Sequence, residues 1–384
     1  MSVLRSNAST TGATGGGHTC ALRSVDAELD AEWDRLALRC GTTPYLRPGW
    51  IRAWTDAFRP GQALSLLTVR RAGELVAALP LVATRLGLRP PVNSETPSFE
   101  PLAVDAEAAA ALVSPLLEHC RHLDLWFVPA GGHERALVRS SEERGCRVDR
   151  QVVRRSPYTR IDDDWELLRD EVLGKSRRKS MARRRRQLGE LGDLAFEVHD
   201  GRSRLRDLLD EGFAMEAAGW KGVQGTAILS RPSTAAFYHR LAEWAAENGL
   251  LRLHFLRLDG RAVAFEFALE QSGALHVLKT AYDEELRRYG PGILILDDGL
   301  AYASKQPHLH VSESLGEDDP YKVEFSTGVH EQLRISIYAD DVAGTAAWMW
   351  RQAVDRSQDQ LRRRLPASAR QRLVRLAQFA DRNR

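Results

Sequence analysis

The chain has 384 residues, of which 43% are hydrophobic and 28% are charged. This balance excludes a wholly disordered, collagen-like or membrane-spanning chain, and the length predicts two domains or one large domain with extensions. The formal net charge is only +2, because 54 Lys and Arg face 52 Asp and Glu. A site for an anionic partner must therefore be sought in the distribution of the charges along the chain.

Four widely spaced cysteines form no C-x-x-C motif: Cys20, Cys40, Cys120 and Cys146. They predict neither a zinc site nor a disulfide framework, and they fit a reducing compartment. Residues 1–18 are rich in small residues and lack the apolar core of a signal peptide. We expect a cytoplasmic protein whose first 18 residues form a disordered leader.

Residues 19–162 alternate between strand and helix patterns. Two apolar runs, Leu64–Val69 and Glu74–Leu81, flank a short turn and predict a hairpin. Asp105–Cys120 has apolar residues at helical spacing behind an Asp that can cap the helix. Further strands are expected at Leu123–Val128 and Val148–Ile161.

Residues 163–340 predict a strand, two helices, three antiparallel strands, a helix and a strand, which is a mixed α/β order. The strands are expected at Ala195–Val198, Leu251–Leu258, Ala262–Glu270, Ala274–Ala281 and near His308–Ser312. The helices are expected near Arg204–Ala218, near Ser233–Asn248 and from Pro291 onward.

Basic residues gather at two places in the chain. Between Lys175 and Arg186, eight of twelve residues are basic and none is acidic. Residues 341–384 carry ten Arg, no Lys and four Asp, a net +6, and we expect a helical tail that Pro366 interrupts. Each segment could bind nucleic acid or an anionic membrane surface, or it could be a solvated face.

The sequence Arg287-x-x-Gly290-x-Gly292 joins a predicted strand to the helix that is expected from Pro291. Glycines let a ligand approach the backbone, and the N–H groups and dipole of a helix N-terminus attract phosphate. The alternative is an ordinary strand-to-helix turn.

Several polar side chains near this turn are candidates for catalysis. Glu266 interrupts an apolar strand, so it lies either on a solvent face or buried as a general base. Lys279 and Lys322 could bind a phosphate or stabilise an oxyanion, although single lysines are commonly solvated. Tyr282 and Asp283 could donate a proton to a leaving thiolate or orient the acceptor, or they could simply form the turn.

Trp220 and Lys221 lie between two glycines and could line an acceptor pocket, or the indole could fill the core. His308-x-His310 lacks a third ligand at a suitable spacing, so no metal is expected. His254 is expected to be an ordinary core or surface histidine. Walker A, G-x-S-x-G and H-E-x-x-H motifs are absent from the sequence, which disfavours NTPases and common hydrolases.

The glycine turn resembles the acyl-coenzyme A pyrophosphate loop of the GNAT acyltransferase superfamily. Four further segments resemble one branch of it, the CelD/BcsL-type or BioF2-like acetyltransferases, over about residues 165–330. These segments are Trp220–Thr226, Leu253–Phe265, Tyr282-Asp283 and Asp318–Lys322.

The N-terminal half is similar to the opening of the same branch at Pro44-Tyr45, Pro48–Trp50 and Gly73–Leu81. That branch is similar to the Fem-type aminoacyltransferases, which carry two GNAT-like domains in one chain. The resemblance implies an α/β (α+β) chain with tandem GNAT-like domains at 19–162 and 163–340. The tail at 341–384 lies outside the matched region. Each domain would hold a mixed, mostly antiparallel sheet flanked by helices.

The resemblance implies transfer of an acetyl or other acyl group from acyl-coenzyme A to an amine or hydroxyl, without a metal. The implied acceptor is a small molecule or a saccharide, and the kinship points toward polysaccharide or cell-envelope biosynthesis. The implied catalytic residues are Glu266, Tyr282, Asp283 and Lys322. The implied coenzyme A ligands are Lys279, Arg287, Arg288, Gly290 and Gly292, and the implied acceptor ligands are Trp220, Lys221 and Tyr321.

Two other functions stay open. In a Fem-like aminoacyltransferase, a basic helix at 175–188 and the 341–384 tail would contact tRNA, and binding would weaken steeply with salt. In a non-catalytic accessory protein of a polysaccharide synthesis complex, the tail would lie on anionic lipid at the inner membrane face.

Overall fold

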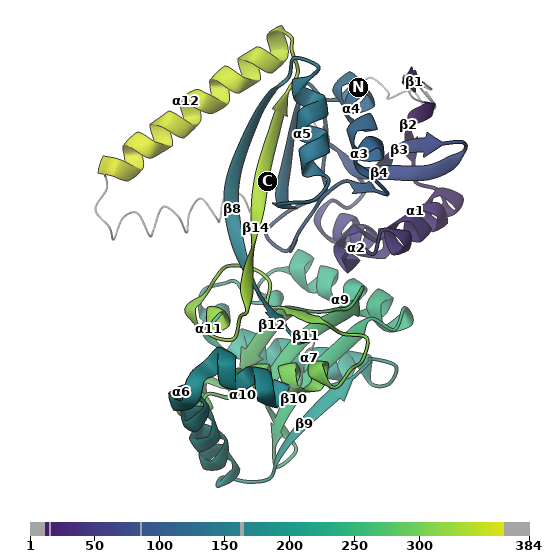
Figure 1. Cartoon of the computed structure of the whole chain (residues 1–384). Helices are drawn as coiled ribbons and strands as arrows, with labels where there is room; N and C mark the ends of the chain where they lie inside the picture. Colours follow the sequence, from purple (N-terminus) through teal and green to yellow (C-terminus); the bar gives the residue numbers. More distant parts are fainter. Residues whose placement is uncertain (1–11, 15–16, 85–86, 162–164, 365–384) are drawn as a thin grey trace. The chain divides into compact units, whose positions relative to one another are not determined.

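The computed structural model describes residues 12–14, 17–84, 87–161 and 165–364. They form two compact units, and each contains a sheet flanked by helices (Figure 1). The first unit holds Met1–Gly41, Gln62–Val153 and Gln332–Arg384, and the second holds Thr42–Gly61 and Arg154–Glu331. The predicted α/β class is confirmed. Most of the predicted leader and Pro366 lie outside the described residues.

The units divide the chain differently from the boundaries expected from sequence. Thr42–Gly61, which the sequence analysis assigns to the first domain, belongs to the second unit. Strand β8 (Arg147–Arg160) begins in the first unit and ends in the second, and β14 (Gly328–Tyr338) runs the opposite way. Within the expected leader, β1 (Gly12–Thr14) pairs with β2 (His18–Ser24).

In the first unit, the strand order is β1-β2-β3-β4-β5, and β6 pairs with β4. Strand β7 pairs antiparallel with β14, and β14 lies next to β8 in a second sheet of eight strands, of order β7-β14-β8-β13-β12-β11-β10-β9. The remaining elements of this unit are α1 (Ala27–Arg39), β3 (Leu64–Arg71), β4 (Glu74–Thr84), β5 (Gly87–Arg89), β6 (Leu102–Ala103), α3 (Ala106–Ala111), α4 (Val113–His119), β7 (His122–Pro129), α5 (Glu134–Glu142) and α12 (Val342–Arg364).

The predicted hairpin is confirmed as β3 and β4. Its turn residues Ala72 and Gly73 both have positive φ, at 50° and 85°. Such a turn matches the twist of the strands it joins. The single helix expected from Asp105 to Cys120 is instead two helices, α3 and α4. As predicted, Asp105 caps the first helix, because its side chain accepts a hydrogen bond from the Ala108 N–H at 2.8 Å. Pro115, in the second helix, has no N–H to donate to a helical hydrogen bond, which disfavours one continuous helix.

Strand β14 was not predicted from the sequence, because buried polar residues interrupt its apolar pattern. Arg334 is only 4% exposed and forms an ion pair with Asp124 at 2.7 Å. Gln332 donates a hydrogen bond to the Pro97 carbonyl at 2.9 Å, and Ser336 donates one to Asp124. Partners on other elements therefore satisfy polar side chains that interrupt the apolar pattern.

In the second unit, the strand order is β8-β13-β12-β11-β10-β9, where β8 contributes its last residues. Neighbouring strands from β12 to β9 are antiparallel, and β12 pairs parallel with β13. The elements are η1 (Pro44–Leu46), α2 (Pro48–Phe58), α6 (Trp165–Gly189), β9 (Leu194–His199), α7 (Leu205–Ala218), α8 (Trp220–Val223), η2 (Ile228–Ser230), α9 (Pro232–Glu247), β10 (Leu251–Leu258), β11 (Arg261–Gln271), β12 (Ala274–Tyr282), η3 (Glu284–Tyr289), α10 (Pro291–Ser304), β13 (Val311–Glu313) and α11 (Pro320–Val323).

Alternate residues of β11 face opposite sides of this sheet. Phe265 packs against α7 and Phe267 against α9, through ring contacts with Phe213 at 6.4 Å and Tyr238 at 5.5 Å. Ala264 and Ala268 belong instead to the core clusters beneath α10 and α6. Because Glu266 has the same alternation as Ala264 and Ala268, it lies on the α10 side of the sheet. Helix α6 bends at Gly174, whose φ is 67°.

Helix α2 packs on α9 at a point that only glycine fits. A Cβ on Gly49 would lie 1.9 Å from Nε1 of Trp244. Replacing Gly49 with Ala is expected to lower the free energy of unfolding by about 1–3 kcal/mol, through forced repacking. Gly189→Ala is the control, because its Cβ would meet no atom within 4 Å. Urea denaturation checks both variants, and equal stability would contradict the α2–α9 packing.

Candidate functional site

The strands β12 and β13 part near the middle of the second unit. Their pairing begins with Ala274 opposite Val311 and ends with His276 opposite Glu313, which is the last residue of β13. Strand β12 continues to Tyr282 without a strand on that side. A cavity of about 20 Å³ opens there, lined by Glu266, Val277, Thr280, Gly292, Leu296, Ser314, Tyr321 and Lys322. This space suits about one water molecule, so a larger ligand requires its walls to open.

Glu266 is the buried carboxylate of this cavity, with 1% of its surface exposed. Its Oε2 lies 3.2 Å from Nδ1 of His254, and its Oε1 accepts a hydrogen bond from Thr280 Oγ1 at 3.4 Å. Helix α10 passes close above, since a Cβ on Gly299 would lie 3.1 Å from the same Oε2. Of the two expected positions for Glu266, the structure has the buried one.

Helix α11 brings Tyr321 and Lys322 to the same cavity. Lys322 Nζ donates a hydrogen bond to the Leu315 carbonyl at 2.8 Å and pairs with Asp319 at 3.3 Å. Burial lowers the pKa of Lys322, and burial raises the pKa of Tyr321, with Asp319 and Glu266 adding to the rise. Leu315 has φ +47°, a conformation that costs free energy in a residue with a side chain. The hydrogen bond from Lys322 thus fixes the strained backbone at Leu315 beside the cavity.

The predicted glycine turn opens α10. Gly290 has φ 66° and ψ 47°, and no side chain caps the helix. A Cβ on Gly290 would lie 2.7 Å from Nη1 of Arg184, which also donates to the Arg288 carbonyl at 3.4 Å. A Cβ on Gly292 would lie 2.7 Å from Cδ1 of Tyr282. The guanidinium of Arg184, from the basic helix, therefore lies against the turn, in the space that a side chain on Gly290 would fill.

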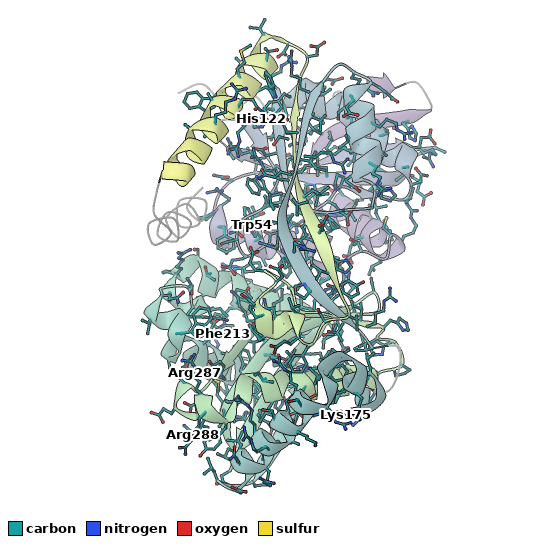
Figure 2. The ribbon with its side chains drawn as sticks, turned by 60° about the vertical axis from the view of Figure 1, so that its left-hand side comes forward. Trp54, His122, Lys175, Phe213, Arg287 and Arg288 are labelled. Atoms are coloured by element: carbon teal, nitrogen blue, oxygen red, sulfur yellow. The ribbon has the colours of Figure 1, made fainter. Side chains whose placement is uncertain are left out.

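The predicted basic helix is the second part of α6, and several of its arginines are already paired. Arg185 binds Asp298 at 2.5 Å, and Arg177 and Arg178 form ion pairs with Glu324 and Asp170. Three other basic side chains are exposed at intervals of four residues: Lys175, Lys179 and Arg183. Arg287 and Arg288 are also exposed, on the η3 turn (Figure 2). The positive charge that remains available is therefore smaller than the sequence suggests.

Lys279 and Asp283 are among the predicted site residues that do not line the cavity. Lys279 is opposite Phe267 in the β11–β12 register, so it faces α9, where its Nζ is 5.2 Å from the Tyr238 ring. Asp283 accepts a hydrogen bond from the Glu285 N–H at 3.0 Å and pairs with Arg261 at 3.0 Å. These contacts correspond to the turn chemistry that the sequence analysis kept as an alternative.

Lys221 reaches the cavity wall from α8. Its Nζ donates to the Thr280 carbonyl and to Oε1 of Glu216, both at 2.9 Å. Burial lowers the pKa of Lys221, while Glu216 acts in the opposite direction. Glu216 is itself 2% exposed and accepts a hydrogen bond from the Ile228 N–H at 2.8 Å. Trp220 is half exposed beside Lys221 and does not fill the core.

His254 has the core position of the two expected for it and is fully buried against Glu266, a contact that was not predicted. Counting from the Asp259-Gly260 turn would pair His254 with Phe265. A bulge between Leu256 and Arg257 shifts the register by one residue and places His254 opposite Glu266. A His and a Glu on apolar neighbouring strands were a usable signal, but the bulge hid their pairing.

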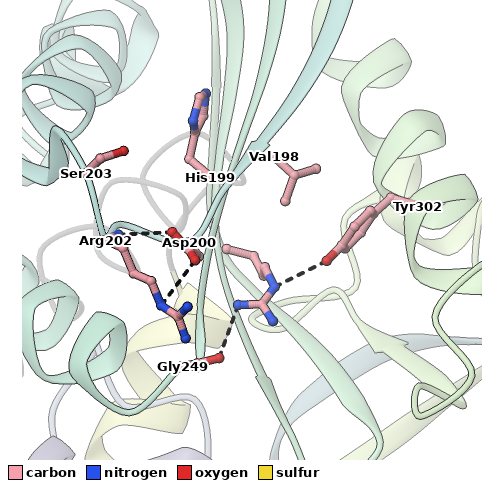
Figure 3. Close-up of a pocket in the computed structure, with 8 residues that line it drawn as sticks. Val198, His199, Asp200, Arg202, Ser203, Gly249 and Tyr302 are labelled. Carbon is pink, nitrogen blue, oxygen red and sulfur yellow. Dashed lines mark hydrogen bonds and ion pairs between the residues drawn. The ribbon is translucent and has the colours of Figure 1, made fainter.

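A second, larger pocket of about 480 Å³ lies at the start of β10 and contains no predicted site residue (Figure 3). It is lined by Val198, His199, Asp200, Arg202, Ser203, Gly249, Arg252 and Tyr302. Its arginines bind neighbours within the protein: Arg252 donates to Tyr302 at 3.2 Å, and Arg202 pairs with Asp200 at 3.4 Å. Unlike the first cavity, this pocket is lined neither by a glycine of the α10 N-terminus nor by a glutamate.

His276 is buried where β12 and β13 begin to part, and its ring meets Tyr45 edge-on at 5.3 Å. Burial lowers its pKa from 6.5 to about 4. Between these values the unfolded chain binds more protons than the native one, so stability falls as pH drops from 6.5 to 4. His276→Phe is expected to remove about 3 kcal/mol of this pH dependence. Urea unfolding at pH 7 and pH 4 measures the loss of stability in the wild type and in His276→Phe. An equal loss in the two proteins would contradict the prediction.

In the described part of the chain, no group of three or more His, Cys, Asp or Glu is placed to hold a metal ion. Residues 175–323 match the family model described as an acetyltransferase (GNAT) domain. No curated protein sequence matches the chain. The matched segment includes the glycine turn, Glu266 and α11.

Solved structures extend the likeness beyond that segment. FemX is 12% identical with a TM-score of 0.54, covering 81% of this chain and 96% of its own. The C-terminal domain of a putative lysylphosphatidylglycerol synthetase from Agrobacterium fabrum is 13% identical with a TM-score of 0.51, covering 84% and 95%. L-PGS from Bacillus licheniformis is 11% identical with a TM-score of 0.51, covering 84% and 95%. At such identities the likeness shows a shared fold, which here includes both units. Residues 175–323 are thus similar in sequence to GNAT acetyltransferase domains, and the chain has the fold of FemX and of these two proteins.

Proposed function

We propose that the second unit transfers an acetyl or other acyl group from acyl-coenzyme A to an amine or hydroxyl acceptor. One observation carries the proposal: an uncapped glycine turn beneath Arg184 opens the helix whose Gly292 lines the Glu266 cavity. Phosphate binds well at such a helix N-terminus. The match of residues 175–323 to a GNAT domain supports the same reaction.

The residues at the turn suit a pyrophosphate group. Gly290 presents backbone that a Cβ would cover, and Arg184 supplies a guanidinium directly above it. Arg287 and Arg288 are exposed on the adjoining turn. When bound, acyl-coenzyme A would supply an activated thioester.

The cavity residues have complementary tasks in this proposal. Glu266 accepts the proton of the attacking N–H or O–H while His254 and Thr280 hold its two oxygens. The Lys322 ammonium stabilises the negative charge that develops on the carbonyl oxygen. The new C–N or C–O bond forms as the C–S bond breaks, and Tyr282, next to Gly292, donates a proton to the departing sulfur.

Further details rest on the CelD/BcsL-type resemblance alone. It favours a saccharide acceptor of polysaccharide or cell-envelope biosynthesis. A cytoplasmic site of reaction is supported instead by the four widely spaced cysteines, which form no C-x-x-C motif. Tyr321, which lines the cavity, and Trp220, which lies beside Lys221, would contact that acceptor.

A thermal-shift titration with coenzyme A and acetyl-coenzyme A tests the donor. A ligand that binds only the folded protein raises its melting temperature by mass action. We expect a saturable rise with both compounds. Absence of a rise at millimolar concentrations would overturn the coenzyme A proposal.

An aminoacyl-tRNA donor is the second candidate. The observation favouring it is the exposed row Lys175, Lys179 and Arg183, whose spacing puts all three on one face of α6. Contacts to phosphates would make the logarithm of the affinity fall linearly with the logarithm of salt concentration. Replacing all three residues with Gln should flatten that slope. Absence of tRNA binding at low salt would reject this donor, and failure of both donors would leave the non-catalytic accessory role.

A further inference from the structure

Between residues 342 and 354, whose side chains the structure describes, one face of helix α12 packs against β8 within the first unit. Arg147 of β8 donates a hydrogen bond to Thr345 at 2.8 Å, and its guanidinium lies 5.4 Å from the Trp348 ring. Gln352 donates to Asp149 at 3.3 Å. These contacts fix which side of the helix faces β8.

The other side of α12 is an exposed apolar stripe. Between residues 342 and 353, every exposed residue is apolar: Val342, Ala343, Ala346, Met349, Trp350 and Ala353. Their spacing places them on one helical face. Val342 is 88% exposed, Met349 59% and Trp350 73%, although such large apolar side chains are usually covered. We call these six residues the α12 stripe.

The charges in and beyond the stripe are mostly positive. Residues 342–354 contain no Asp or Glu, and Arg356 is exposed one turn further on. From residue 341 to the last residue, the sequence has ten Arg and four Asp, a net +6. A partner that covers the stripe therefore gains from negative charge.

We propose that the α12 stripe docks on an anionic lipid surface, with the helix lying in the plane of the headgroups. Trp350 and Met349 would enter the headgroup boundary, where an indole is well accommodated, and the arginines would meet anionic lipids. The described helices include none that is long and apolar enough to cross a membrane, so the contact is peripheral. A second copy fits less well, because its own Arg-rich segment would face this one.

Vesicle flotation of the full chain tests this proposal. The probes are vesicles of phosphatidylcholine alone and of phosphatidylcholine mixed with phosphatidylglycerol. We expect binding to the mixed vesicles, and at least about a tenfold loss of binding in Met349→Ser/Trp350→Ser. The matched control is Leu38→Ser/Leu191→Ser, which removes two side chains that are 53% and 47% exposed elsewhere. The control should bind like the wild type.

Four outcomes would overturn the proposal. In the first, the protein does not float with the mixed vesicles, and in the second it floats equally with the neutral ones. In the third, the stripe variant and its control lose binding equally. In the fourth, binding appears only after residues 365–384 are deleted. A dimer by light scattering that the stripe variant dissociates, without flotation, would assign the stripe to a second copy. The readout needs neither donor nor acceptor, so it is independent of the proposed reaction.

Discussion

Replacing Glu266 with Gln is expected to slow acyl transfer by about 10²–10⁴-fold, because an amide cannot accept the proton of the acceptor. Gln has nearly the same shape and can still bond to His254 and Thr280. Coenzyme A affinity should stay close to wild type, because the Gly290 turn is unaltered. The rate is measured as thiol release from acetyl-coenzyme A over a panel of amine and sugar acceptors.

Glu270→Gln is the matched control for this substitution. Glu270 lies four residues further along β11 and is also buried, but it binds Arg252 at 2.7 Å and accepts a hydrogen bond from Tyr302 at 3.0 Å. The control variant should lose stability and keep its turnover rate. Full activity in Glu266→Gln, or an equal loss of rate in both variants, would remove Glu266 from the reaction.

Replacing Gly290 with Ala is expected to abolish the melting-temperature rise with coenzyme A, which corresponds to at least about a tenfold weaker affinity. The added methyl group would occupy the space between the turn and Arg184. It would also place a side chain at φ +66°, which costs about 1–2 kcal/mol of stability. Titrations at several coenzyme A concentrations separate the binding effect from the stability effect.

Gly260→Ala separates these two effects independently. Gly260 has φ +78°, and a Cβ there would meet no atom within 4 Å. This variant should lose similar stability in the β10–β11 turn and keep the full response to coenzyme A. If both variants respond like the wild type, the glycine turn is not the coenzyme A site.

The sequence predicted elements well where local pattern decides structure. The hairpin of β3 and β4 and the three strands from Leu251 to Tyr282 follow from apolar runs separated by Gly turns. The assignment of Thr42–Gly61 to the second unit follows from packing between distant segments, such as Gly49 under Trp244. Nothing in the local pattern of α2 indicates which unit it completes.

The same distinction holds at the site. Glu266, Tyr321, Lys322 and Gly292 meet at one cavity, as expected for residues of one site. Lys279 faces the other side of the sheet because a bulge near Phe267 and Ala268 interrupts the β11–β12 register. Glu216, which holds Lys221 against β12, was not predicted, because nothing in its helical sequence marks a buried acid.

The pairing of β7 with β14 has a consequence for how the protein is made. Arg334 and Asp124, which this pairing joins, are 210 residues apart in sequence. At translation rates of about 5–20 residues per second, β7 leaves the ribosome about 10–40 s before its native partner. The N-terminal unit is therefore synthesised first but completed last. During that interval the apolar side chains of β7 are available to chaperones, and a chain that stops before β14 would leave this unit without the strand that completes it.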